Sequence, residues 1–77
     1  DGIIRAQMNA TVSQITAQEG DKVSAGDRLI VLEAMKMEQS VLAPADGHIE
    51  KIEVNEGESV SAGLILCRFV QQNEDLA

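Results

Sequence analysis

The sequence predicts an all-β domain, a sandwich or flattened barrel with quasi-two-fold symmetry, and three observations support this class. Val, Ile and Leu are plentiful, and the many β-branched side chains among them favour strands over helices. Turn signals recur every few residues, and no stretch has the spacing of a long amphipathic helix. One pattern is also written twice along the chain. Short strands between frequent turns are typical of a small β sandwich.

The repeat has an offset of 37 residues. The residues Val-Ser-Ala-Gly at 23–26 recur at 60–63, and Glu-Gly at 19–20 recurs at 56–57. Each half is one supersecondary unit that could not bury its apolar face alone, so the two halves are expected to share a core. The segment that joins them, residues 33–38, is expected at one end of the molecule, with both termini near the other.

In the first half, strands are expected at residues 3–6, 10–15, 23 and 28–33, with turns at 7–9, 19–21 and 24–27. Gly20 can take a positive φ in its turn at little cost. Val12 and Ile15 are core candidates in a strand that alternates only weakly. The four apolar residues at 29–32 do not alternate, so periodicity does not tell which face of that strand points inward.

In the second half, strands are expected at residues 38–43, 49–54 and 64–70. Pro44 ends the first of these, because proline cannot donate to a ladder. The middle strand has core candidates and solvent-facing residues, namely Ile49, Ile52 and Val54 against Glu50, Lys51 and Glu53. We expect one domain over residues 1–77, with a core at about 3–70 and a flexible tail at 71–77.

Composition excludes several classes of function. Thirteen acidic and six basic residues give a net charge of −7, which argues against nucleic acid binding. No apolar run approaches the ~20 residues of a membrane span. The single cysteine, Cys67, reads as a small buried hydrophobe, and the single histidine, His48, has no companion for a metal site. Asp21, Asp27 and Asp46 read as turn-formers. No catalytic residue and no metal ligand is expected, and the domain should catalyse nothing by itself.

The segment between the halves carries the candidate site. Two strand-like runs flank Glu-Ala-Met-Lys-Met-Glu at 33–38 and predict a β-hairpin, although its tip lacks the Asn-Gly or Asp-Gly that hairpins favour. Lys36 stands between Met35 and Met37 instead. An exposed methionine gains nothing from water, so an enzyme or partner is expected to read these side chains.

The run Ala34-Met35-Lys36-Met37 resembles the biotin attachment motif of the biotinyl (biotin carboxyl carrier) domains of biotin-dependent carboxylases, and the resemblance covers about residues 4–70. It implies two four-stranded antiparallel sheets packed face to face, a barrel-sandwich hybrid. It also implies biotin in amide linkage on Lys36, with Glu33, Ala34, Met35 and Met37 read by the modifying enzyme.

The resemblance further implies a carrier that takes carboxyl groups from a biotin carboxylase to a carboxyltransferase, in an acyl-CoA carboxylase, after modification by a biotin protein ligase. The location would be the cytoplasm, or the mitochondrial matrix in a eukaryote. The chain departs from the family at Gln7 and Ala10, where Pro and Gly are usual and where the second half keeps Pro44 and Gly47. The run from 15 to 26 leaves no room for the extra loop of some bacterial carriers.

Two alternatives stay open. A lipoyl carrier domain of a 2-oxoacid dehydrogenase complex resembles this fold, but its lysine typically lies in an Asp-Lys-Ala context, which Met35 and Met37 do not fit. A structural module of an efflux-pump adaptor would have a long helical hairpin in place of the short tip.

Overall fold

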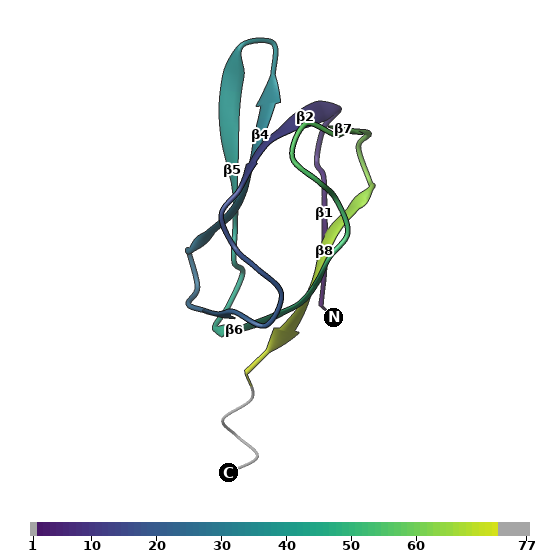
Figure 1. Ribbon diagram of the computed structural model, residues 1–77. Helices are drawn as coiled ribbons and strands as arrows, with labels where there is room; N and C mark the ends of the chain where they lie inside the picture. The colour runs from purple at the N-terminus through teal and green to yellow at the C-terminus, as the bar shows by residue number, and fades with distance from the viewer. Residues whose placement is uncertain (1, 73–77) are drawn as a thin grey trace.

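The computed structural model describes residues 2–72, and these form two antiparallel sheets of four strands each (Figure 1). The first sheet has the order β1-β8-β6-β3 and the second the order β5-β4-β2-β7. The strands are β1 (Ile3–Arg5), β2 (Ala10–Ile15), β3 (Lys22–Val23), β4 (Arg28–Ala34), β5 (Met37–Leu42), β6 (Gly47–Ile52), β7 (Ser59–Val60) and β8 (Ile65–Gln71). Each sheet therefore draws strands from both halves of the chain, and the expected flattened sandwich is confirmed.

The sequence repeat is also a structural repeat. The offset of 37 residues carries β2 onto β6, β3 onto β7 and β4 onto β8 with identical bounds. Hydrogen bonds between the halves repeat in the same way, because Val12 N–H donates to the Glu58 carbonyl and Ile49 N–H donates to the Asp21 carbonyl. The two halves are thus interleaved around a quasi-two-fold axis, and each sheet needs strands from both halves of the chain.

The core lies between the sheets and is almost entirely aliphatic. Its largest fully buried side chains are Leu29, Ile30, Ile49, Leu66, Val12 and Cys67. Ile15, Ile52 and Val23 are partly buried against this cluster, and Val54 is buried although it lies beyond the end of β6. All the predicted core positions therefore contact one continuous core, which is what a small domain needs for stability.

Matching β-bulges interrupt β2 and β6. The register shifts between Val12 and Gln14 against β4, and between Ile49 and Lys51 against β8. A bulge places two residues opposite one on the partner strand. This explains the weak alternation of β2 and the exposure of both Glu50 and Lys51 in β6.

Several strand limits differ by one or two residues from the expected ones. The middle strand of the second half, expected at 49–54, is β6 at Gly47–Ile52. The last strand runs over β8 to Gln71 instead of 64–70, so residue 71 belongs to the sheet and not to a flexible tail. One residue beyond β8, Gln72 N–H donates to the Asp46 carbonyl, so the backbone hydrogen bonding continues past the end of the strand. The rest of the predicted tail, residues 73–77, lies outside the described residues.

Two carboxylates tie the halves together. Glu56 Oε2 accepts the N–H of Ile15 at 2.9 Å, and Glu19 Oε2 accepts the N–H of Ile52 at 3.0 Å. The short strands β3 and β7 do not reach the ends of β2 and β6, so these backbone donors need another acceptor there. The repeated Glu-Gly pairs of the sequence thus have a structural role, which the sequence alone did not reveal.

The hairpin of β4 and β5 projects from one end of the sandwich, whereas β1 begins and β8 ends toward the other (Figure 1). The quasi-two-fold relation makes this necessary. It carries the pair β5 and β4 onto the pair β1 and β8, so the hairpin tip and the chain ends occupy equivalent positions on opposite sides of the axis. Within residues 2–72, no helix is long and apolar enough to cross a membrane.

Candidate functional site: a lysine hairpin

The candidate site is the tip of the β4–β5 hairpin. The two strands pair over six positions and end with Ala34 opposite Met37, so the loop contains two residues, Met35 and Lys36. Two-residue hairpin loops require a backbone twist that types I′ and II′ provide. The predicted hairpin is present at residues 34–37 despite the absence of Asn-Gly.

Met35 and Lys36 take φ values of 52° and 68°, and within residues 2–72 they are the non-glycine residues with positive φ. Positive φ at both loop positions is the pattern of a type I′ turn. A left-handed conformation costs an L-residue with a Cβ roughly 1–2 kcal/mol. The hairpin therefore stores backbone strain at the two positions where the sequence places large side chains.

The tip is open to solvent on all sides of the lysine. The side chains of Met35 and Met37 are 95% and 73% exposed, and Lys36 is exposed as well. In a protein whose other apolar residues are mostly buried, these two methionines form the most exposed apolar surface. An external pocket can therefore reach the amine and both thioethers without any rearrangement of the fold.

The two faces of the hairpin differ in chemistry. Side chains alternate along a strand, so Met37, Gln39 and Val41 share the face of β5 that continues toward the core. Glu33 and Glu38 are directly opposite each other on the other face, and both are exposed. Like charges in such a pair repel, so this face is locally acidic at a cost in stability. Ala34 is half-buried beside the tip.

The other side chains that the sequence singled out lie on the sandwich, away from the hairpin tip. His48 is exposed on β6, and no group of three metal-ligating side chains occurs within residues 2–72. Cys67 is buried, and this burial raises the pKa of its thiol to about 11, so it is a poor nucleophile at neutral pH. Asp21 and Asp27 accept backbone N–H groups in their own turns, and Asp46 accepts the N–H of Ala25.

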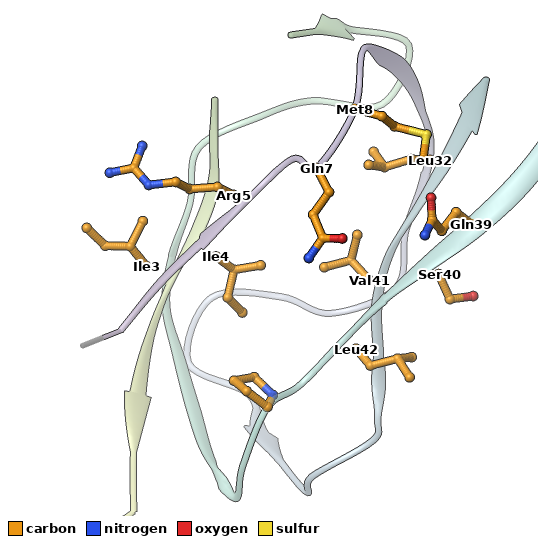
Figure 2. Close-up of a pocket in the computed structure, with 11 residues that line it drawn as sticks. Ile3, Ile4, Arg5, Gln7, Met8, Leu32, Gln39, Ser40, Val41 and Leu42 are labelled. Atoms are coloured by element: carbon orange, nitrogen blue, oxygen red, sulfur yellow. The ribbon is translucent and has the colours of Figure 1, made fainter. Parts of the chain in front are cut away.

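One surface feature was missed by the sequence reasoning. A groove of about 330 Å³ lies between β1 and β5, the edge strands of the two sheets on one side of the sandwich (Figure 2). Gln7, Gln39 and Val41 are among its lining residues. The period-2 pattern of β5 could have placed Gln39 beside Val41, but the approach of β1 depends on the packing of the two sheets.

These observations define a class: a small all-β domain that presents one exposed lysine at the tip of a two-residue hairpin. The family model described as "Biotin-requiring enzyme", which covers biotin and lipoyl attachment domains, matches residues 3–69. The "Biotinylated protein TB7.3 homolog" of Mycobacterium leprae is 42% identical over 64 residues, covering 83% of this chain and 90% of that protein.

Two solved structures are similar over most of the chain. One is a single-chain, multi-domain long-chain acyl-CoA carboxylase, with a TM-score of 0.87 and 38% identity over 100% of this chain and 8% of that one. The other is the lipoyl domain of the 2-oxoglutarate dehydrogenase complex of Azotobacter vinelandii, with a TM-score of 0.83 and 28% identity over 95% of this chain and 100% of that one.

The chain belongs to the family of biotin and lipoyl attachment domains. Within it, the chain is a biotin carboxyl carrier domain, a non-catalytic carrier of covalently attached biotin, and the expected family, fold class and cofactor are confirmed. The alpha subunit of mouse methylcrotonoyl-CoA carboxylase is 39% identical over 70 residues, which are 91% of this chain and 10% of that protein. The chain thus spans a tenth or less of the first carboxylases it matches.

Proposed function

We propose that Lys36 is the residue that carries biotin, in amide linkage through its Nζ. The observation that supports this most directly is the tip itself, a solvent-exposed lysine between two exposed methionines on a two-residue turn. The other lysines, Lys22 and Lys51, are exposed on strands of the sandwich and lack such a setting. The donor chemistry also fits, because amide formation needs one accessible primary amine and no further ligand.

The domain contributes position to this reaction, and a biotin protein ligase contributes the chemistry. A lysine amine is protonated at neutral pH, so the ligase must remove a proton from Nζ before it can attack an activated carboxyl group. The strained turn and the six paired positions of the ladder behind it fix the backbone of Lys36, so the amine extends from one defined point. Met35, Met37, Glu33 and Ala34 would be read by the ligase, with the flexible thioethers adapting to its pocket.

As a carrier, the domain would bring biotin to a biotin carboxylase and then to a carboxyltransferase. Biotin supplies a ureido nitrogen that can hold a carboxyl group, and the protein supplies the handle. Lysine and biotin together reach on the order of 15 Å. Such a reach is short between the active sites of two large enzymes, so the whole domain would move on a tether, which maintains an effective concentration of roughly millimolar.

The parent enzyme that this likeness favours is an acyl-CoA carboxylase. The long-chain acyl-CoA carboxylase covers the full chain, and the mouse methylcrotonoyl-CoA carboxylase subunit covers nearly all of it. Pyruvate carboxylase of Bacillus subtilis, at 44% identity over 66 residues, is the alternative. The domain would work in the cytoplasm or, as the mouse relative's name indicates for that protein, in mitochondria.

Incubation of the chain with a biotin protein ligase, ATP and biotin tests the assignment. One biotinyl group per chain, seen by intact mass and located on Lys36 by peptide mapping, is the expected result. A parallel incubation with a lipoate ligase is expected to leave the mass unchanged. A lipoyl adduct without a biotinyl adduct would overturn the biotin proposal in favour of the lipoyl alternative.

The recognition role of the methionines has its own test. Met37→Ala is expected to slow biotinylation about tenfold, which corresponds to roughly 1.4 kcal/mol of lost transition-state binding. Since Met37 is 73% exposed, the melting temperature should stay unchanged. Met8→Ala, a methionine at the bend after β1, serves as the matched control and should be modified at the normal rate. Equal rates for all three proteins would contradict the assigned role.

A further inference from the structure

The groove between β1 and β5 lies on the side of the sandwich from which β5 runs to the lysine hairpin, and the carrier role of the tip does not use it. Its volume of about 330 Å³ is at the small end of the range of ligand sites, the size of one compact head group. Ile4, Leu32 and Val41 provide apolar walls, and Figure 2 shows the side chain of Gln7 among them, with Gln39 at the side nearer Leu32.

Strand β5 leads from the tip directly into this groove. Met37, Gln39 and Val41 are on one face of the strand, and Gln39 and Val41 are lining residues. At roughly 3.4 Å per residue, Gln39 to Val41 are about 10–17 Å from Lys36 along the strand. The arm that Lys36 and biotin would form reaches on the order of 15 Å. The far end of the arm can therefore return to the groove, with its aliphatic part over Met37.

The groove also offers the hydrogen-bonding groups that the end of the arm needs. A cyclic urea has an N–H donor beside a carbonyl acceptor, and a primary carboxamide offers the matching acceptor and donor in one plane. Gln7 and Gln39 each provide a carboxamide, and the walls suit the apolar thioether ring. Arg5 is the charged residue of the lining; its guanidinium donates to the Gly63 carbonyl at 2.9 Å, and Figure 2 shows it directed away from Gln7 and Val41.

The two walls of the groove differ at one informative position. The repeat places Gln7 in the first half where the second half has Pro44, and both residues line the groove. A proline at position 7 would remove the carboxamide that lies among the apolar walls in Figure 2. The departure from the repeated pattern thus supplies a second carboxamide to the groove, in addition to that of Gln39.

We propose that the groove between β1 and β5 is a resting site for the ureido ring of the biotin carried on Lys36, held by the carboxamides of Gln7 and Gln39. This inference rests on the proposed attachment at Lys36. The bound ring would be in equilibrium with the extended arm, so that a partner enzyme captures the arm from the free fraction. The carrier would then present biotin to solvent for only part of the time.

Nuclear magnetic resonance of the 15N,13C-labelled chain, unmodified and fully biotinylated, tests the resting site. We expect cross-peaks between the ring protons and the methyl groups of Ile4 and Val41, and displaced side-chain amide signals for Gln7 and Gln39. Signal changes confined to residues 34–38, with no ring contact to the groove, would overturn the resting site.

A variant pair separates docking from folding. The double substitution Gln7→Ala and Gln39→Ala should abolish the ring contacts while the rest of the spectrum and the extent of biotinylation remain normal. Gln14→Ala, at an exposed position of β2 outside the groove, is the control and should keep them. If the ring is docked for half of the time, streptavidin association should be about twofold faster for the double variant, in proportion to the free fraction.

The two proposals fail in distinguishable ways. A chain that acquires no biotinyl mass would overturn both the attachment at Lys36 and the resting site. A chain that acquires the mass on Lys36 but shows no ring contacts, or shows contacts that survive the double substitution, would overturn the resting site alone.

Discussion

The lysine hairpin and the glycine turns of the sandwich meet the same backbone requirement with different residues. Within residues 2–72, positive φ occurs at four glycines and at two other residues. Gly20, Gly26, Gly57 and Gly63 have φ values of 88–92°, whereas the loop of the hairpin uses Met35 and Lys36. Glycine takes this conformation without a steric cost, and residues with a Cβ do not.

The support around these turns differs as well. In the sandwich, side-chain oxygens brace the turns: Asp21 accepts the N–H of Gln18, and Glu58 accepts the N–H of Asn55 at the equivalent position. Within the described residues, no side-chain hydrogen bond involves residues 33–38. The hairpin relies on its strand ladder alone.

This contrast teaches where the molecule accepts strain. In the sandwich, the residue that fits the backbone best is also the residue found. At the tip, large side chains stand in a conformation that glycine or asparagine would adopt more readily. Strain that persists at a solvent-exposed site is a sign of function. The side chains of Met35 and Lys36 are therefore needed there for a reason outside the fold, which agrees with their proposed recognition and modification.

The largest expected effect is the complete loss of biotinylation at the hairpin tip, with the sandwich intact. Lys36→Arg should abolish biotinylation, because a guanidinium is not a nucleophile for amide formation. The fold should be unaffected, since Lys36 is exposed. Intact mass after treatment with ligase and the melting temperature are the measurements. Lys51→Arg, on the exposed face of β6, is the control and should be modified normally. One biotin on the Lys36→Arg protein would refute the site assignment.

The next effect acts on the glycine turns. Gly20→Val and Gly57→Val should each reduce the free energy of unfolding by about 1–3 kcal/mol through backbone strain. A Cβ at either position would meet nothing within 4 Å, so no clash contributes. Asparagine tolerates positive φ, so Gly20→Asn and Gly57→Asn are the matched controls and should cost less. Urea denaturation measures all four. Equal losses for Val and Asn would contradict the strain explanation.

Much of this molecule could be predicted from the repeat. The offset of 37 residues predicted two-fold architecture and a tip opposite the chain ends, because duplicated units with apolar faces must pack together. The consecutive apolar residues 29–32 left the inward face of β4 open. In the structure Leu29, Ile30 and Leu32 are in the core, and a register shift between Arg28 and Ile30 allows two neighbours to point inward.

What the sequence could not provide depends on contacts between distant segments. The bulges in β2 and β6 depend on the pairing with β4 and β8, and no local residue preference predicts them. The carboxylates of Glu19 and Glu56 accept hydrogen bonds from backbone N–H groups 33 and 41 residues away. The local sequence therefore indicated only that these residues lie in turns. The groove between β1 and β5 likewise exists only once both sheets are packed.

A substitution at the hairpin tip should stabilise the fold, whereas Gly20→Val and Gly57→Val should destabilise it. Met35→Gly should raise the free energy of unfolding by about 0.5–1 kcal/mol, because the relief of left-handed strain exceeds the added chain entropy of glycine. Biotinylation should become slower as a recognition side chain is lost. Met37→Gly is the control: Met37 is in β5 with an ordinary φ, so glycine there should destabilise the hairpin. A loss of stability in Met35→Gly would show that the methionine side chain supports the turn.

The smallest expected effect compares carboxylates in the two regions. Glu19→Gln and Glu56→Gln should each cost about 0.5 kcal/mol, because the charge-assisted bonds to Ile52 and Ile15 become neutral ones. At the tip, Glu38→Gln should instead gain about 0.2–0.5 kcal/mol by removing the repulsion from Glu33. Chemical denaturation of the three variants in parallel resolves the signs.

The sign of the change in the free energy of unfolding can be compared directly among the three variants, because each replaces Glu by Gln. A loss of stability in the sandwich variants and a gain in the tip variant would mean that the sandwich carboxylates stabilise the fold. The hairpin carboxylates would then be present although they destabilise it. Losses at all three positions would mean that Glu38 stabilises the hairpin, and its acidic face would then need no partner to explain it.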